Sequence, residues 1–182
     1  MPLLNAIATP YAEALLQVAE SRSETDTVAD QAKGLLAVWN GSSELRQALA
    51  SPVLEPESKK AALAKLFNDQ LTPSLQNLLK LLADRQRIAV LDAVLVRFLE
   101  LYRELRQITL AKVVSATELT EAQQQQLNQK VQAIAGTSAV EFDLSIDPSL
   151  IGGFIVSMGS QVIDASLSGQ VRRLGLALAK VG

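Results

Sequence analysis

The sequence predicts an α+β fold, in which a six-helix N-terminal bundle precedes a small mixed α/β domain. Apolar residues recur at helical spacing through about the first hundred residues. After Arg106 the pattern changes to β-branched runs and strict apolar–polar alternation, which are typical of strands. Helices that come first and strands that come later favour two domains over one interleaved sheet. We therefore expect a bundle over residues 1–106 and an α/β domain over residues 107–182.

The first two helices are marked by the residues at their ends. Thr9 and Pro10 combine a capping residue with proline at the first helical position, which favours a helix start. Asn40 and Gly41 form a helix-ending pair. The first helix has an apolar face made of Tyr11, Ala14, Leu15 and Val18. The face of the second is made of Val28, Ala32, Leu35, Leu36 and Trp39.

Four more helices complete the predicted bundle. Two short ones cover about residues 43–50 and 57–67. Thr72 and Pro73 repeat the cap-plus-proline start, and the sixth helix covers about residues 88–106. The fifth helix presents Leu75, Leu78, Leu79 and Leu82. The stripe of the sixth is Leu91, Val94, Leu95, Phe98, Leu101, Tyr102 and Leu105. Six helices with short joints make a compact bundle.

The second domain should contain strands around one helix. Residues 108–115 are rich in β-branched side chains and predict a strand. Thr120 and Gln123 fit a capping box, and the helix that it opens should run to about Ala135. Residues 140–147 alternate strictly between apolar and polar, which predicts a half-buried strand.

A hairpin and a last helix close the predicted domain. Residues 154–158 and 161–164 should be two strands, because Gly159 and Ser160 between them suit a tight turn. The last helix should begin near Ser166, with apolar residues at spacings of four, three and four: Leu167, Val171, Leu174 and Leu178.

The composition excludes the common kinds of catalytic site. The 182 residues are 48% hydrophobic and 20% charged, so the chain should fold. It has no cysteine and no histidine, which excludes thiolate nucleophiles, cysteine-bound metals and imidazole acid–base catalysis. No phosphate-binding loop of the Gly-x-x-x-x-Gly-Lys-Ser/Thr type occurs. Gly152 and Gly153 lack the spacing for dinucleotide binding and instead indicate a bulge or a close backbone approach. We expect no catalytic residue, metal or cofactor.

Charge is balanced in both halves of the chain. Residues 1–106 hold 12 basic and 13 acidic residues, and residues 107–182 hold 5 and 6. Neither half has the basic surplus of a nucleic-acid-binding domain. Apolar stretches are broken by charge well before about 20 residues, so no membrane span is expected, and the N-terminus lacks a secretory pattern. Any membrane association should be indirect.

The C-terminal segment resembles the signature of the F-type ATP synthase delta subunit family, whose mitochondrial counterpart is the oligomycin-sensitivity-conferring protein. Residues 11–15 and 49–52 also look like the first helix and the end of the third helix of that family. The abundant glutamine and short start resemble cyanobacterial or chloroplast members. The signature residues are Asp147, Pro148, Ser149, Leu150, Ile151, Gly152, Gly153, Phe154, Ile155 and Val156, then Gly159, Val162, Ile163, Asp164, Ser166, Arg172, Arg173 and Leu174.

This resemblance implies a non-catalytic stator subunit of the proton-driven rotary ATP synthase. Such a subunit joins the catalytic head to the membrane-anchored peripheral stalk and is needed to couple proton flow to ATP synthesis. It would be a peripheral membrane protein on the cytoplasmic or stromal side of a bacterial plasma or thylakoid membrane, attached only through the complex. Its expected partners are the head's alpha subunits and the b-type stalk subunits, with no nucleic acid.

The resemblance also implies two partner-binding faces. The N-terminal segments of the alpha subunits would lie in a groove between the first and fifth helices, lined by Tyr11, Ala14, Leu15, Val18, Leu75, Leu78, Leu79 and Leu82. The stalk would meet the last helix at Leu167, Val171, Arg172, Arg173, Leu174 and Leu178. The alternative for each apolar stripe is that the core of the bundle itself consumes it, because burying one leucine contributes roughly 1.5–3 kcal/mol.

Three other functions stay open at the level of the residues. An unrelated helical adaptor or scaffold would not co-purify with the synthase head. An enzyme that used only carboxylates or a lysine would turn over a substrate and lose that activity with one carboxylate substitution. A helical RNA-binding bundle would need more basic charge than residues 1–106 carry.

Overall fold

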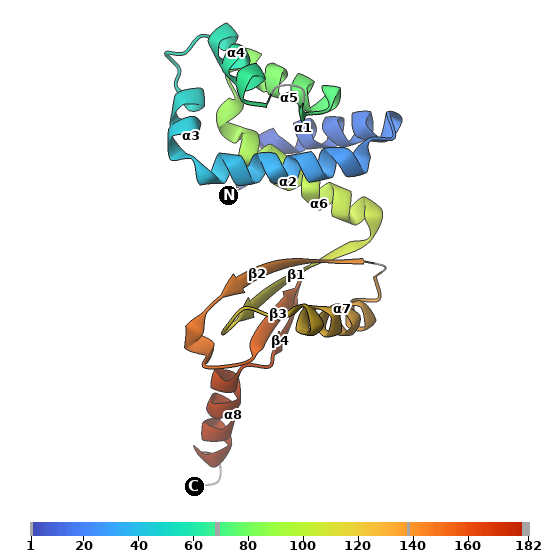
Figure 1. Cartoon of the computed structure of the whole chain (residues 1–182), viewed down its shortest axis with the longest axis vertical. Coiled ribbons are helices and arrows are strands. Elements are labelled where there is room, and N and C mark those ends of the chain that lie inside the picture. The colour runs from blue at the N-terminus through green and yellow to red at the C-terminus, as the bar shows by residue number, and fades with distance from the viewer. Residues whose placement is uncertain (1, 68–69, 138, 180–182) are drawn as a thin grey trace. The chain divides into compact units, whose positions relative to one another are not determined.

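The computed structural model describes residues 2–67, 70–137 and 139–179 (Figure 1). In these ranges the chain forms eight α-helices and four strands, so the predicted α+β class is confirmed. The chain divides into two compact units, Met1–Glu104 and Leu105–Gly182. Each unit has its own hydrophobic core.

The first six helices follow one another with short joints. A 3₁₀ turn, η2 (Ile88–Val90), leads directly into the sixth helix. The helices are α1 (Pro2–Ser21), α2 (Thr25–Gly41), α3 (Ser43–Ala50), α4 (Pro56–Phe67), α5 (Pro73–Asp84) and α6 (Leu91–Arg106). The predicted start of the first helix at Thr9 and Pro10 is wrong, because α1 begins at Pro2 and contains Pro10. Ala8, two residues before the proline, is fully buried, and its packing offsets the backbone hydrogen bond that Pro10 cannot make.

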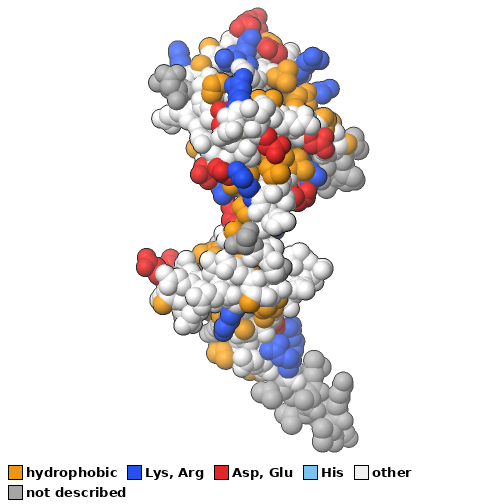
Figure 2. Space-filling model, turned by 90° about the vertical axis from the view of Figure 1, so that its right-hand side faces the viewer, with side chains coloured by type: hydrophobic (Ala, Val, Ile, Leu, Met, Phe, Trp, Pro, Cys, Tyr) orange, Lys and Arg blue, Asp and Glu red, His pale blue; other side chains and the backbone are white. Residues whose placement is uncertain are grey.

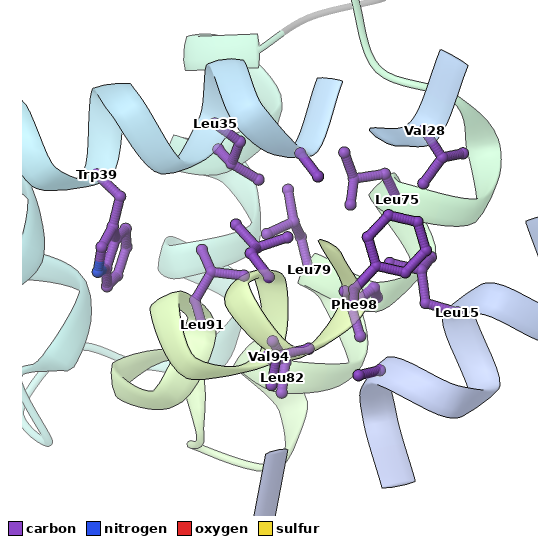
Figure 3. Close-up of a cluster of buried hydrophobic side chains, with 14 of the residues drawn as sticks. Leu15, Val28, Leu35, Trp39, Leu75, Leu79, Leu82, Leu91, Val94 and Phe98 are labelled. Carbon is purple, nitrogen blue, oxygen red and sulfur yellow. The ribbon is translucent and has the colours of Figure 1, made fainter. Parts of the chain in front are cut away.

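The core of the first unit forms around α6. Figure 3 shows its Leu91, Val94 and Phe98 among side chains of three other helices. Phe98 and Val94 are fully buried. The facing side chains are Leu15 of α1, Val28, Leu35 and Trp39 of α2, and Leu75, Leu79 and Leu82 of α5. The apolar stripes of α1, α2, α5 and α6 therefore meet in one cluster.

Polar contacts hold the helix ends of this unit. The side chain of Gln31 in α2 donates to the carbonyl of Gln70 at 2.9 Å and accepts from the amide of Thr72 at 2.8 Å. Lys60 of α4 pairs with Glu57 at 2.7 Å and with Asp84 of α5 at 2.8 Å. These contacts tie α2 to the start of α5, and α4 to the end of α5.

The second unit contains a four-stranded mixed sheet in the order β2-β1-β3-β4. The strands are β1 (Ile108–Ser115), β2 (Ala139–Ile146), β3 (Phe154–Met158) and β4 (Gln161–Asp164). β1 and β2 are parallel, and the other pairs are antiparallel. Helix α7 (Glu121–Ala135) connects the parallel strands, as such pairs require, and begins with the predicted capping box at Thr120. Leu127 and Val131 of α7 pack on the sheet.

Burial along β2 differs from the predicted alternation. Val140 and Phe142 pack against the cluster that contains the α7 side chains. Residues 143–146 are all exposed, including Leu144 at 46% and Ile146 at 54%. β2 is an edge strand, and the apolar row continues beyond the part of it that packs with α7. The strand is confirmed, but the expected half-burial holds only for its first part.

A network of hydrogen bonds sets the start of the last helix, α8 (Leu167–Ala179). The Asp164 carboxylate accepts from the amide of Ser166 at 3.0 Å and from its hydroxyl at 2.6 Å. The Ser166 hydroxyl oxygen in turn accepts from the amide of Gly169 at 3.0 Å. The amide of Leu167 donates to the carbonyl of Gly152 at 2.9 Å, which ties α8 to the chain that enters β3.

Glycine is required at this junction because backbones and a carboxylate approach closely. A Cβ on Gly169 would collide with the Asp164 carboxylate, and one on Gly153 would collide with the carbonyl of Ala165. Gly153 also has a φ of 78°, which favours glycine. Of the two predicted alternatives, a bulge or a close backbone approach, the close backbone approach is therefore confirmed at Gly153, whereas a Cβ on Gly152 would meet the side chain of Leu167.

Replacing the aromatic centre of the first core should destabilise the protein. Phe98→Ala should lower the free energy of unfolding by about 3–5 kcal/mol, because it removes a fully buried ring and leaves a cavity. Chemical denaturation monitored by circular dichroism measures this change. The control is Val96→Ala on the same helix, whose side chain is 43% exposed and should change stability little. Equal losses for the two variants would contradict this packing.

The cap on α8 should make stability depend on pH. Hydrogen bonds from the Ser166 hydroxyl and amide, helped by the charges of Arg173 and Arg172, hold the pKa of Asp164 below its usual value. A carboxyl whose pKa is lower in the folded than in the unfolded protein stabilises the fold at pH values above its usual pKa, near 4. This contribution is lost as the pH falls through the lower pKa of the folded state. Asp164→Asn should therefore lower Tm at pH 7, and the difference should shrink below about pH 4. A Tm difference of the same size at pH 7 and about pH 3 would contradict this role.

Candidate partner-binding surfaces

The described residues contain no cluster of three or more side chains suited to a metal ion. Within them, no helix has the length and apolar character needed to cross a membrane. Shifted pKa values occur at helix starts and ion pairs: hydrogen bonds at Ser149 lower the pKa of Asp147, and hydrogen bonds to Asp84 and Glu57 raise that of Lys60. These two shifts have structural causes, namely the hydrogen bonds of a turn and of an ion pair.

The residues predicted to face the head divide between core and surface. Tyr11 is half-buried, while Ala14 and Val18 are exposed, Val18 at 40%. The other five are buried: Leu15, Leu75, Leu78, Leu79 and Leu82. Figure 3 shows four of these five turned into the core; Leu78 is not labelled there. The buried leucines hold α1 and α5 in the unit, and the exposed residues are available to a partner.

Two exposed apolar residues on the same helices were missing from the sequence prediction. Ile7 of α1 is 36% exposed, and Leu81 of α5 is 43% exposed. Ile7 precedes Tyr11, Ala14 and Val18 at helical spacing, so all four lie on one face of α1. The expected helix start at Thr9 hid Ile7, and Leu81 lies outside the leucine stripe of α5. We call Ile7, Tyr11, Ala14, Val18 and Leu81 the α1–α5 surface.

The α1–α5 surface has a polar contact at Tyr11. The hydroxyl of Tyr11 accepts a hydrogen bond from the guanidinium of Arg87 at 3.1 Å, which links this face of α1 to the segment after α5. α1 and α5 also pack against each other. Figure 2 shows hydrophobic side chains interspersed with charged ones on the face of the first unit that it presents.

The predicted stalk face on α8 lies on the surface as far as the structure describes it. Leu167 is 47% exposed and Val171 is 64% exposed, four residues apart on one helix face. Arg172 and Arg173 are exposed, and they approach the Asp164 carboxylate at 3.4 Å and 3.7 Å. The side chains of Leu174 and Leu178 lie outside the described residues.

Comparisons of the sequence with known proteins identify the family. Residues 7–178 match the family model of the ATP synthase delta (OSCP) subunit. ATP synthase subunit delta of Synechococcus sp. (strain CC9605) is 68% identical over 180 residues, which cover 99% of each chain. That of Prochlorococcus marinus (strain MIT 9303) is 70% identical over 181 residues and 100% of each chain. The subunit of the organellar chromatophore of Paulinella chromatophora is 66% identical over 182 residues.

The fold also matches a solved structure. A chain of the Toxoplasma gondii mitochondrial ATP synthase hexamer superposes with a TM-score of 0.73, covering 93% of this chain and 96% of that one. The two sequences are 24% identical, so this likeness concerns the fold alone. The family match, the identities of 66–70% over nearly the whole length and the signature around Gly152 agree. The chain belongs to the ATP synthase delta (OSCP) subunit family.

Proposed function

We propose that this chain is a non-catalytic stator subunit of a proton-driven rotary ATP synthase, joining the catalytic head to the peripheral stalk. The observation that carries the proposal is the match to delta subunits from end to end, at 66–70% identity. In a rotary synthase the rotor turns inside the head, and the head must not turn with it. A stator subunit therefore needs two persistent contacts and no turnover.

The two units supply two separate places for these contacts. We assign the head to the first unit, in which α1–α6 act as one six-helix bundle, and the stalk to the second unit, with the domain boundary near Arg106. Each unit has its own hydrophobic core, so a partner can load one surface while the other unit stays folded. Two linked binding sites hold more strongly together than either does alone, through effective concentration.

The head contact is assigned to the α1–α5 surface. Its apolar residues follow one face of α1, which suits an amphipathic helix laid along it. The N-terminal segments of the alpha subunits are the partners expected there. The buried leucines predicted for this site act indirectly, because they keep α1 and α5 packed together.

The location follows from the complex. In the proposed complex, this chain would reach the membrane only through its partners. We place it on the cytoplasmic or stromal side of a plasma or thylakoid membrane, where the catalytic head projects. Immunogold labelling of membrane sections, with and without the other synthase subunits, would test this placement.

A charge on the α1–α5 surface should weaken the head contact without unfolding the protein. Val18→Glu should reduce affinity for a peptide of the alpha-subunit N-terminus by about tenfold, because it puts a carboxylate where an apolar side chain would be buried. Isothermal titration calorimetry measures the affinity. Val53→Glu, at an 88% exposed position between α3 and α4, is the matched control and should bind normally. Unchanged binding by Val18→Glu would refute this surface.

A charge on α8 should have the opposite selectivity. Val171→Glu should reduce co-purification of the b-type stalk subunits while the head subunits still co-purify, because it alters the second unit alone. Val18→Glu should keep the stalk and lose head subunits. Affinity purification of the tagged full chain, followed by quantification of each partner, measures both. Loss of both partners from either single variant would contradict two independent surfaces.

A further inference from the structure

The strand β2 has a free edge. Within the described residues it pairs with β1 alone, at one end of the sheet order β2-β1-β3-β4 (Figure 1). A strand in this position leaves every second amide and carbonyl without a partner in the sheet. Such an edge can accept an extended segment of another chain as an additional strand.

The register with β1 shows which backbone groups of β2 point outward. Just beyond the end of β2, the amide of Asp147 donates to the carbonyl of Ser115 in β1 at 2.9 Å. Ser115 is in register with Ile146, and the backbone groups of successive residues point to opposite sides of a strand. The amides and carbonyls of the odd-numbered residues therefore point to β1. Those of Phe142, Leu144 and Ile146 point to the free edge.

The two faces of β2 differ in chemistry. Phe142 packs in the cluster with α7, and Leu144 and Ile146 continue this row on the same face of the strand. Leu144 is 46% exposed and Ile146 is 54% exposed. The opposite face has the carboxylates of Glu141 and Asp143. A strand added at this edge would therefore meet apolar side chains on one face and acids on the other.

A cleft lies beside the exposed apolar pair. It has a volume of about 480 Å³, and Leu144 and Ile146 line it together with residues at the start of α7, among them Leu119 and Gln124. Leu119 also packs against the core of this unit. Apolar side chains of an added strand could reach over Leu144 and Ile146 into the cleft. They would bury apolar surface that the unit leaves exposed, which favours binding.

Charge argues against a second copy of this chain at the edge. Acids stand at three odd-numbered positions, Glu141, Asp143 and Asp147. In an antiparallel pair of two β2 strands, two residues face each other when their numbers add up to twice the number of the residue on the symmetry axis. For every axis residue in the range 141–145, an acid then faces an acid, which is destabilising. The edge therefore disfavours its own sequence and favours a cationic one.

A lysine of β1 adds to this preference. Asp143 is exposed, and its register neighbour on the side away from the edge is Lys112. A cation on an added strand opposite Asp143 would place this carboxylate between two positive charges. Cross-strand pairs of opposite charge stabilise a sheet. The position beside Asp143 therefore suits lysine or arginine.

We propose that β2 binds an extended segment of a partner protein as an additional strand, and that apolar and basic residues alternate in this segment. Its apolar side chains would cover Leu144 and Ile146 and enter the cleft, and its basic side chains would lie beside Asp143. Its backbone would bond to the outward amides and carbonyls of β2. This surface differs from the α1–α5 surface and from α8, so the inference goes beyond the proposed head and stalk contacts.

The probe is a synthetic peptide of alternating valine and lysine, about as long as β2. The full chain should bind it about tenfold more tightly than a peptide of alternating valine and glutamate, as measured by isothermal titration calorimetry. The valine–lysine peptide with methylated backbone amides keeps the charge but cannot donate to the edge, so it should bind about tenfold more weakly. Equal affinity for any two of these peptides, or no binding of the first, would overturn the inference.

Two variants at one position separate the side chain from the backbone. Leu144→Ser removes the apolar side chain and should weaken binding of the valine–lysine peptide about threefold. Leu144→Pro also removes the outward amide, which makes no bond to β1, and should weaken it about tenfold or more. Val162→Ser, at a 64% exposed position on the other edge strand β4, is the control and should bind normally. Parental binding by Leu144→Pro, or a loss in Val162→Ser, would contradict the site.

Hydrogen exchange on the unaltered chain tests the edge without any variant. The amides of Leu144 and Ile146 should exchange about tenfold more slowly once the valine–lysine peptide is bound, because they become hydrogen-bonded. The amide of Ser145 already points to β1 and should change less. Unchanged exchange at Leu144 and Ile146 would refute strand addition. Analytical ultracentrifugation covers the other occupant: a dimer of the parent chain that is lost in Ile146→Lys would make the partner a second copy and the inference wrong.

Discussion

Burial of apolar stripes around α6 is the interaction on which the first unit depends. Phe98, Val94 and Leu91 hold α1, α2 and α5 in one cluster, and most of the leucines on α1 and α5 are used there. Along α1 and α5, the α1–α5 surface is the part that we propose for the head contact. A head-binding site of this kind can be rigid, because the residues beneath it are fully packed, and its exposed residues can vary at little cost to stability.

The second unit meets a different constraint, because α8 must be oriented from its first turn. The Asp164–Ser166–Gly169 network and the close approach of Gly153 to Ala165 fix that turn against the sheet. The same corner contains Ile151, whose φ of 66° strains a β-branched residue. Features that carry a local cost, namely obligatory glycines and a strained isoleucine, therefore gather where the stalk is proposed to bind. Such a concentration is expected where function competes with local stability.

The sequence could predict the elements whose signals are local. Capping and turn residues located the ends of α2 and α7 and the β3–β4 turn within a residue or two. The start of α1 was wrong because tertiary packing of Ala8 outweighs a proline rule. Helical periodicity placed Leu78 in the apolar stripe of α5 and Leu81 outside it, but it could not tell whether the stripe faces the core or a partner; the structure buries Leu78 and exposes Leu81. No local signal separates the packed part of β2 from its exposed part, since the same alternation runs through Phe142 and Ile146.

Reconstitution tests the central claim that this chain transmits force and performs no chemistry. Membranes stripped of the head and of this chain, supplied with purified head, should regain proton-driven ATP synthesis only when the chain is added. The purified head should hydrolyse ATP at the same rate with or without it. Coupled synthesis that returns equally well in its absence would contradict the account.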